Sequence, residues 1–415
     1  IVNNRYEDLS YRGPIREKGI PNVFNVFDLD NTKKKARQDE WQEQTQSIFA
    51  SVEVGWKSML YLTLTGRNDW ASQLANSSTP CFFYPSVGLS GVISEMLTLP
   101  EFIDYMKVRG SFSSVGMPYP RNLTSPTYEY DEANQQWKPK THYPIKDLKP
   151  ERTNSWELGL DMRLFKDFSL GFSWYLANTF NQTFDPKVSV SSGYSKIYLQ
   201  TGYVRNSGVE LSLGYGHTWN NHLHWESNFT LSHNKNTIKD LVTSYIHPET
   251  GLPITQNRLD VGGLGKARFI LKKGGTLGDL YTQSDLKRDN SGMVEIDPSG
   301  ALTTEDNLPD IKLGSVFPKA NLAWNNRFEW RGISLSALFT ARIGGIAYSA
   351  TQAAMDQYGV SERSAQARDN GGVLLNGRTL VDAQTYYSLI GNSSGLPQYY
   401  TYSATNVRLQ EASVG

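Results

Sequence analysis

Apolar and polar residues alternate strictly along the segment 155–164, SWELGLDMRL. A period of two places successive side chains on opposite faces of a β-strand. The alternation resumes over 168–176 after three turn residues, so the two segments predict a β-hairpin with one apolar and one polar face. The apolar positions of the first segment are Trp156, Leu158, Leu160, Met162 and Leu164.

The same alternation recurs along the rest of the chain. Each segment is close to the nine to eleven residues with which a tilted strand crosses a bilayer. The sequence therefore predicts roughly eleven strands of this kind. Besides the hairpin, the predicted strands cover about 48–56, 60–64, 87–93, 106–112, 209–215, 225–231, 322–328, 333–339 and 403–415.

The predicted connections alternate between short or medium segments and long ones. Outer-membrane barrels have short periplasmic turns and long extracellular loops. We therefore predict an all-β fold, a transmembrane antiparallel β-barrel over 45–415, preceded by an extracellular loop over 1–44. The short or medium connections are 55–59, 94–105, 165–167, 217–222 and 330–332, and the extracellular ones are 68–82, 115–153, 179–204, 234–316 and 343–402.

A barrel of this kind assigns the two faces of each strand. The polar face lines a hydrated interior and the apolar face contacts lipid. The alternative is a soluble β-protein whose apolar face is its core, which would need a second layer and shorter loops. We predict lipid contact for Leu158, Leu160, Leu170, Phe172, Leu211 and Leu213, and an aromatic belt near the short turns from Trp56, Trp156, Trp219, Trp225, Trp324 and Trp330.

The predicted number of strands is odd, whereas single-chain bacterial barrels have an even number. An open sheet in lipid would leave edges of unpaired N–H and C=O groups, each costing several kcal/mol as an order of magnitude. We therefore expect this chain to be part of a larger barrel of the 22-stranded class, with the plug domain outside this chain.

Composition excludes other classes of protein. The chain of 415 residues has 41 Lys and Arg against 41 Asp and Glu, so it lacks the basic excess of a nucleic-acid-binding protein. No apolar run is long enough for a transmembrane helix. The single cysteine, Cys81, excludes an internal disulfide and a zinc ribbon.

Three segments resemble sites of bound ions or phosphates, but each lacks a required feature. His217, His222 and His224 gather near a predicted turn without a fixed acidic or cysteine partner. The acidic segment 285–297 lacks the Gly and Glu spacing of a calcium loop. The glycine-rich segment 262–269 lacks a Ser or Thr after its Lys. We predict no catalytic residues, no metal and no cofactor, and therefore no enzyme.

Ligand contacts are expected in the long segments. The segment 115–153 interleaves aromatic rings, which stack on sugars, with acidic and amide side chains that bond hydroxyl groups. The same rings could equally pack against other loops or a protein partner. The candidates are Tyr119, Tyr128, Tyr130, Trp137 and Tyr143, together with Asp69 and Trp70 near the end of a predicted strand.

An ordered set of motifs resembles one family. The motifs are GIPNVFNV, LYLTLTGRNDWAS, FFYPSVGLSGVISE, KVRGSFSSVG, LKPERTNSWELGLDMRLF, NSGVELSL and NFTLSHNKNTIKDL, with ATNVRLQEASVG at the end. Together they resemble the C-terminal half of the barrel of SusC/RagA-type TonB-dependent outer-membrane transporters.

The resemblance implies a multi-pass barrel in the bacterial outer membrane with an N-terminal plug. It implies a SusD-like surface lipoprotein as a lid, contact with the TonB complex through the plug region, and active import of oligosaccharides. Some members import peptides instead. The alternatives are a passive porin, a structural barrel or an adhesin, and, in the soluble class, a carbohydrate-active β-protein.

Overall fold

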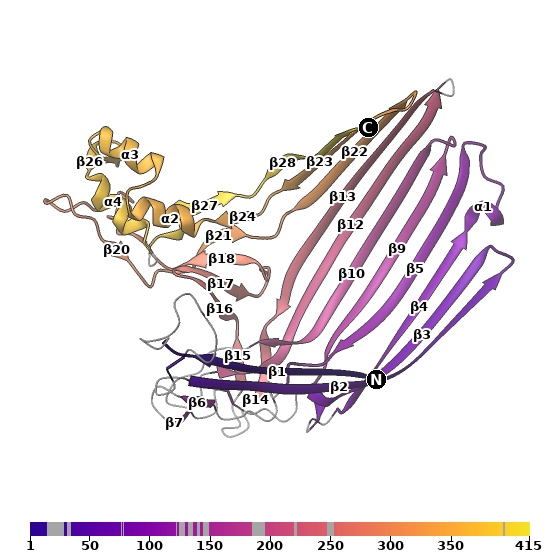
Figure 1. Cartoon of the computed structure of the whole chain (residues 1–415), viewed down its shortest axis with the longest axis horizontal. Coiled ribbons are helices and arrows are strands. Elements are labelled where there is room, and N and C mark those ends of the chain that lie inside the picture. The colour runs from indigo at the N-terminus through magenta and orange to yellow at the C-terminus, as the bar shows by residue number, and fades with distance from the viewer. Residues whose placement is uncertain are drawn as a thin grey trace.

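The computed structural model describes all residues except 15–28, 31–34, 76, 78, 122, 124–128, 132–135, 139–141, 144–148, 185–195, 220–221, 247–252 and 393–394. Its main feature is a curved antiparallel sheet of 12 strands, with β1 and β28 at its edges (Figure 1). In sheet order the strands are β1 (Val2–Arg12), β2 (Lys35–Trp56), β3 (Leu60–Ala71), β4 (Cys81–Val92), β5 (Ile103–Met117), β9 (Glu151–Leu164), β10 (Phe168–Phe184), β12 (Leu199–Trp219), β13 (Leu223–Asp240), β22 (Ala320–Trp330), β23 (Ile333–Ile343) and β28 (Asn406–Val414).

The remaining elements are short and lie in the connections. The helices are α1 (Ile93–Met96), α2 (Ala350–Gln357), α3 (Glu362–Asp369) and α4 (Ala383–Ile390), with 3-10 turns η2 (Ser72–Leu74) and η4 (Pro397–Tyr400). The strands are β6 (Glu129–Asp131), β7 (Gln136–Lys138), β8 (His142–Tyr143), β11 (Lys196–Ile197), β14 (Val242–Ile246), β15 (Pro253–Gln256), β16 (Arg258–Leu264), β17 (Ala267–Lys272), β18 (Asp279–Thr282), β19 (Asp285–Leu286), β20 (Thr304–Glu305), β21 (Ile311–Ser315), β24 (Ile346–Tyr348), β25 (Val373–Leu375), β26 (Thr379–Val381) and β27 (Thr401–Ser403). In the described part of the chain, no helix combines the length and the apolar character that crossing a membrane requires.

The hairpin predicted from the alternating pattern is confirmed as β9 and β10. Leu164 pairs with Phe168, so the chain reverses within the predicted turn 165–167. Phe165 and Lys166 have φ values of 51° and 64°, and positive φ is the conformation that tight hairpin turns demand. Each of the other predicted strands also corresponds to one strand of the large sheet.

The twelfth strand, β1, corrects our interpretation of residues 1–44 as a loop. Val2–Arg12 pair with 35–45 of β2 in an unbroken register. This pairing was missed because β1 has no strict alternation: its sequence, VNNRYEDLSYR, is polar on both faces. Backbone pairing with β2, rather than burial of an apolar face, makes it a strand.

Several strands are also longer than predicted. β2 has 22 residues, β12 has 21 and β13 has 18. The alternation used for prediction marks only the part of a strand with one apolar and one polar face. Beyond it the first part of β2 is polar on both faces, whereas the extensions of β12 and β13 bury Val204 and Ile238 in a small apolar cluster. The strands continue because their backbones remain paired with their neighbours.

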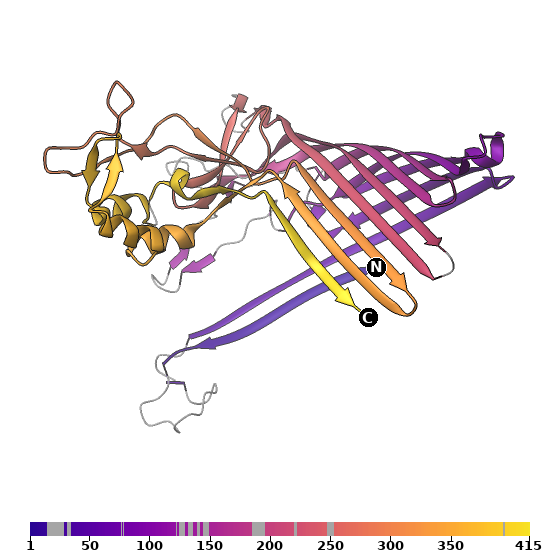
Figure 2. The same ribbon diagram turned by 90° about the horizontal axis from the view of Figure 1, so that it is seen from above.

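The connections keep the predicted alternation, with one exception. The links 57–59, 165–167, 220–222 and 331–332 are short and lie at one end of the sheet. The link 72–80 at the opposite end is no longer than the link 93–102, because β3 and β4 extend further than predicted. Both views show the strands running side by side at a slant (Figures 1 and 2).

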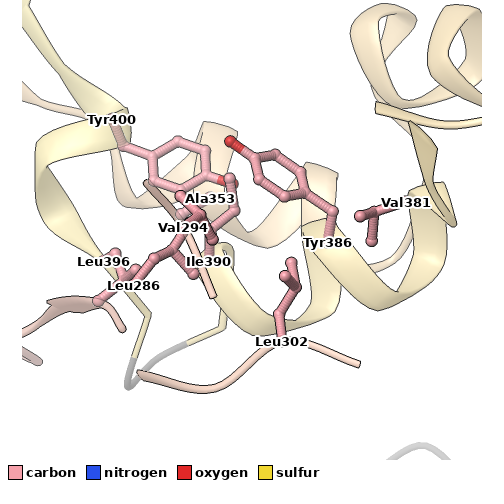
Figure 3. Close-up of a cluster of buried hydrophobic side chains, with 9 residues drawn as sticks. All are labelled: Leu286, Val294, Leu302, Ala353, Val381, Tyr386, Ile390, Leu396 and Tyr400. Atoms are coloured by element: carbon pink, nitrogen blue, oxygen red, sulfur yellow. The ribbon is translucent and has the colours of Figure 1, made fainter. Parts of the chain in front are cut away.

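The two longest connections fold together into a lobe, which we define as residues 258–315 and 346–403. We predicted both as long extracellular loops. They share one buried core, to which Leu286, Val294 and Leu302 contribute from the first connection (Figure 3). The second connection contributes Ala353, Val381, Tyr386, Ile390, Leu396 and Tyr400. The lobe lies at the end of the sheet opposite the short turns (Figure 1).

A buried carboxylate with an ion pair stabilises the lobe, in addition to its apolar core. Asp356 in α2 is fully buried and accepts hydrogen bonds from Ser361, Arg363 and Gln352. Burial alone would raise the pKa of this carboxyl, but the bonds from Arg363 and Ser361 outweigh it and lower the pKa. The lobe is therefore a folded unit rather than a set of independent loops.

Candidate functional site

The apolar residues of the large sheet share one face across neighbouring strands. Leu160 pairs with Phe172, which pairs with Leu211, and Leu170 pairs with Leu213. Leu158 on the same face is 57% exposed. No second sheet covers these side chains among the described residues, so lipid contact of the six predicted positions stays a prediction that the geometry permits.

The opposite, polar face carries a groove with a volume of about 640 Å³. It crosses eight strands of the sheet, from β5 to β28. Its polar lining consists of Arg109, Asp161, Ser173, Glu210, Ser212, Thr230, Ser232, Asn321, Thr340, Arg342, Arg408 and Gln410. Such a surface can bind a polar ligand through several hydrogen bonds and charges.

Arg109 organises one end of this groove. Its Nη1 lies 2.6 Å from Asp161 Oδ2, and its Nη2 donates to Ser173 Oγ at 2.6 Å. Glu157 Oε1 is 3.4 Å from the same nitrogen. The guanidinium thus joins β5, β9 and β10 across the polar face. At this end of the groove positive and negative charges are matched.

At the other end, Arg342 and Arg408 lie on the neighbouring strands β23 and β28. Arg342 Nη2 donates to the backbone carbonyl of Val316 at 2.6 Å. Neither arginine makes an ion pair with any residue that the structure describes. Glu210, on β12 between the two ends, likewise makes no ion pair within the described chain.

These groove residues were not among the sequence candidates. Most of them occupy polar positions in or directly beside a predicted alternating segment, so part of the signal was present in the strand pattern. The sequence could not show which polar residues of distant strands meet, because that depends on register. Candidate residues were sought in loops, where binding residues are enriched, rather than in the wall.

Asp69 and Trp70, which we predicted as candidate ligand contacts, point to opposite faces of β3. Asp69 is 7% exposed and its carboxylate is already bound: Arg67 Nε donates at 2.7 Å and Tyr84 Oη at 2.5 Å. Trp70 is 41% exposed. Successive side chains of a strand diverge in this way, and ligand contact by either residue stays a prediction.

The predicted aromatic candidates of 115–153 are only partly described. Tyr119 is buried, with 3% of its surface exposed, and in this structure it packs inside rather than facing a ligand. The backbones of Tyr130 and Trp137 pair in the β6–β7 hairpin, and that of Tyr143 lies in β8. Tyr128 and the side chains of Tyr130, Trp137 and Tyr143 lie outside the described residues, so their ligand contacts stay predictions.

The predicted aromatic belt is present in part. Trp56, Trp219 and Trp330 are the last residues of their strands before short turns, and Trp225 lies near the start of β13. Trp156 and Trp324 lie further along β9 and β22, so their placement at the turns was wrong. Trp156 lies eight residues before the end of β9, and Trp324 lies six residues before the end of β22.

The three segments weighed as ion or phosphate sites have structural roles. His217 Nδ1 lies 2.8 Å from Asp167, whereas His224 Nδ1 lies 2.9 Å from Thr218, so the two rings have separate partners. In 285–297, Asp289 and Asp297 accept backbone N–H groups of their own turns. The segment 262–269 forms the β16–β17 hairpin.

The chain matches proteins of one family. A family model described as "TonB dependent receptor-like, beta-barrel" matches residues 2–410. TonB-dependent receptor P39 of Formosa agariphila is 24% identical over 271 residues, covering 62% of this chain and 23% of that protein. TonB-dependent receptor P26 of the same organism is 23% identical over 350 residues, covering 78% and 34%. The chain thus matches about a quarter to a third of the length of these relatives.

Solved structures show the same fold. The RagAB peptide transporter superposes with a TM-score of 0.75 at 16% identity, covering 99% of this chain and 46% of that one. The RagAB peptide importer in its "open-open" state gives a TM-score of 0.73 at 17% identity, covering 99% and 45%. At this identity the likeness concerns the fold alone, and it supports the interpretation of the 12-stranded sheet as part of a barrel wall.

Proposed function

The chain belongs to the family of TonB-dependent receptor-like β-barrels, and from that premise we propose that the whole protein imports a hydrophilic nutrient, in the first instance an oligosaccharide, using energy delivered through TonB. The family is one of transporters and receptors, not an enzyme class, and places the chain in the bacterial outer membrane. The chain spans less than half of the RagAB structure that it matches, so import is a property proposed for the whole protein.

The observation that carries the proposal is the polar face of the sheet. A wall that presents a polar groove of about 640 Å³ on one side and exposed apolar side chains on the other suits passage of a hydrated molecule. Hydroxyl and amide side chains such as Ser232, Asn321 and Thr340 can bond successive hydroxyl groups of a sugar chain.

A peptide is the second candidate. The charged residues of the groove favour it, because a neutral sugar chain has no group that needs Arg342, Arg408 or Glu210. The fold likeness to a structure described as a peptide transporter is compatible with this choice, although it does not extend to the substrate.

Uptake in cells tests the proposal. The full-length gene is deleted and restored, and uptake of labelled oligosaccharides and oligopeptides is measured with and without a protonophore. We expect uptake that requires both the gene and the proton-motive force. Uptake that persists after the protonophore would identify a passive porin and refute energised import.

We further propose that a SusD-like lipoprotein covers the lobe. The β25–β26 hairpin turns Val373 and Val381 into the core, whereas the paired Leu374 and Leu380 are each 58% exposed. Tagged full-length protein should co-purify from detergent-solubilised outer membranes with a surface lipoprotein, and Leu374→Asp with Leu380→Asp should abolish this. Leu264→Asp, which changes an exposed leucine of the β16–β17 hairpin, is the control. Equal recovery of the lipoprotein by both variants would contradict this docking surface.

A further inference from the structure

The groove on the polar face has unbalanced charge. Arg109 at one end is matched by Asp161 at 2.6 Å. At the other end Arg342 and Arg408 have no acidic partner in the described part of the chain. Two uncompensated guanidinium groups on one wall repel each other unless an anion lies between them. This imbalance indicates a bound anionic group.

The register brings the two arginines within reach of one ligand. Arg408 pairs with Thr340, and Arg342 pairs with Asn406, so the arginines are diagonal neighbours on the same face of β23 and β28. Diagonal neighbours have Cα atoms about 7–8 Å apart, which long side chains can bridge. Guanidinium groups so placed can converge on a carboxylate.

Arg342 is held in place for this role. Its Nη2 donates to the carbonyl of Val316 at 2.6 Å, which fixes the side chain against the segment that precedes β22 in the chain. Its Nε is buried without a hydrogen-bond acceptor among the described residues. A buried donor without a partner is unfavourable, and an acceptor on a ligand would satisfy it.

Glu210 marks a second charged position along the same groove. In the register, Glu210 lies opposite Ser232, Ser232 opposite Asn321, and Asn321 opposite Arg342. Three strand spacings separate Glu210 from Arg342, about 14 Å at ~4.8 Å per spacing. An extended peptide of about four residues spans a similar length. Its ammonium and carboxylate ends could reach Glu210 and the arginines together.

We propose that this groove is a carboxylate-binding subsite for the transported molecule. Arg342 and Arg408 bind the carboxylate, and Asn321 and Ser232 contact the polar body of the ligand. The carboxylate belongs either to the C-terminus of a short peptide or to a uronic acid of an acidic oligosaccharide. The inference rests on the proposed import and narrows its substrate class to molecules that bear a carboxylate.

Binding to the purified full-length protein tests the subsite. The probes are tetra-alanine, tetra-alanine amide, trigalacturonate and the neutral trisaccharide maltotriose, measured by calorimetry. We expect at least one carboxylate probe to bind, and Arg342→Gln or Arg408→Gln to weaken it about tenfold or more, as loss of a charge-assisted hydrogen bond does. Arg331→Gln, in a short turn outside the groove, should leave binding unchanged.

Glu210→Gln separates the two sources of the carboxylate. For a peptide, Glu210→Gln and the C-terminal amide should each weaken binding. For a uronate, Glu210→Gln should preserve or improve binding because a like charge is removed. Both results support the carboxylate subsite and identify which ligand it takes.

Three results would overturn the subsite. The first is binding of no carboxylate probe, and the second is equal binding of maltotriose and trigalacturonate that neither arginine variant alters. The third is a fall in the unfolding temperature of the ligand-free Arg408→Gln variant, which would show that a carboxylate of the protein itself holds Arg408; Arg342→Gln also loses the bond to Val316 and is not used for this comparison. Proton-driven uptake in cells is measured independently, so import can stand if the subsite fails.

Discussion

The guanidinium of Arg109 lies directly over the backbone of Gly159. A Cβ atom at Gly159 would be 2.5 Å from both Cζ and Nε of Arg109, closer than side chains tolerate. Gly159 pairs with Arg109 on one side and Ser173 on the other. The missing side chain therefore lets Arg109 cross β9 and bond Ser173 on β10.

Gly159→Ala should displace Arg109 and break its bonds to Asp161 and Ser173. We expect a loss of about 1–3 kcal/mol in the free energy of unfolding, the usual cost of overpacking. A urea titration of the full-length protein folded into lipid vesicles measures it. Gly216→Ala is the matched control, because it lies on the same face of a strand and its Cβ would meet nothing within 4 Å. Equal costs would contradict the role of Gly159.

The assignment of the faces predicts opposite responses at two adjacent residues. Leu213 lies on the apolar face opposite Leu170, and Ser212 lines the polar groove. Leu213→Arg should cost about 2–4 kcal/mol if it faces lipid near mid-bilayer, whereas Ser212→Arg should cost much less. The same vesicle titration compares them. A larger cost at Ser212 would reverse the two faces.

The orientation in the membrane can be tested by labelling. Ser58 lies in the short turn after β2, and Ser291 lies in the lobe at the opposite end; both are exposed. In a Cys81→Ser background, a membrane-impermeant maleimide should label Ser291→Cys on intact cells and Ser58→Cys only after the outer membrane is permeabilised. Labelling of Ser58→Cys on intact cells would place the short turns outside.

Asp310 gives the lobe an acid-sensitive ion pair. Arg258 Nε and Nη2 donate to the two oxygens of Asp310 at 2.7 and 2.9 Å, and Lys272 Nζ lies 2.8 Å away. The bonds from Arg258, aided by Lys272 and opposed by burial, lower the pKa of Asp310 to about 2. Because the pKa of Asp310 is lower in the folded protein than in the unfolded chain, the ion pair stabilises the lobe at pH values above the ordinary aspartate pKa near 4. This stabilisation is lost as the pH falls from 4 to 2.

Hydrogen exchange in β16 and β17 measures this effect. Asp310→Asn should exchange faster than the unchanged protein at pH 5, and the difference should shrink toward pH 2 because the native carboxyl is then also neutral. Asp297→Asn, in an exposed turn outside this sheet, is the control. A difference that grows on acidification would contradict the assigned sign.

Local sequence patterns identified β9 and β10 because Trp156 to Leu164 and Phe168 to Leu176 alternate without interruption. The same method failed for β1, where residues such as Arg5 and Glu7 make both faces polar. It also missed the Arg109 cluster and the Arg342–Arg408 pair, since no local pattern reports which strands are neighbours. The alternation of side chains along β3 places Asp69 and Trp70 on opposite faces, and their contact with a ligand stays a prediction.

The sequence by itself determined the class of fold, the two faces of each strand and the contrast between short and long connections, because each depends on residues close together in the chain. The motifs that resemble the SusC/RagA family added the expected location in the outer membrane and the expected role in import. Only the tertiary structure decided that the two halves of the lobe, 258–315 and 346–403, share a core, since Leu286 and Tyr400 meet through folding alone. It also decided which charges line the groove, because strand register sets the distance between residues far apart in sequence.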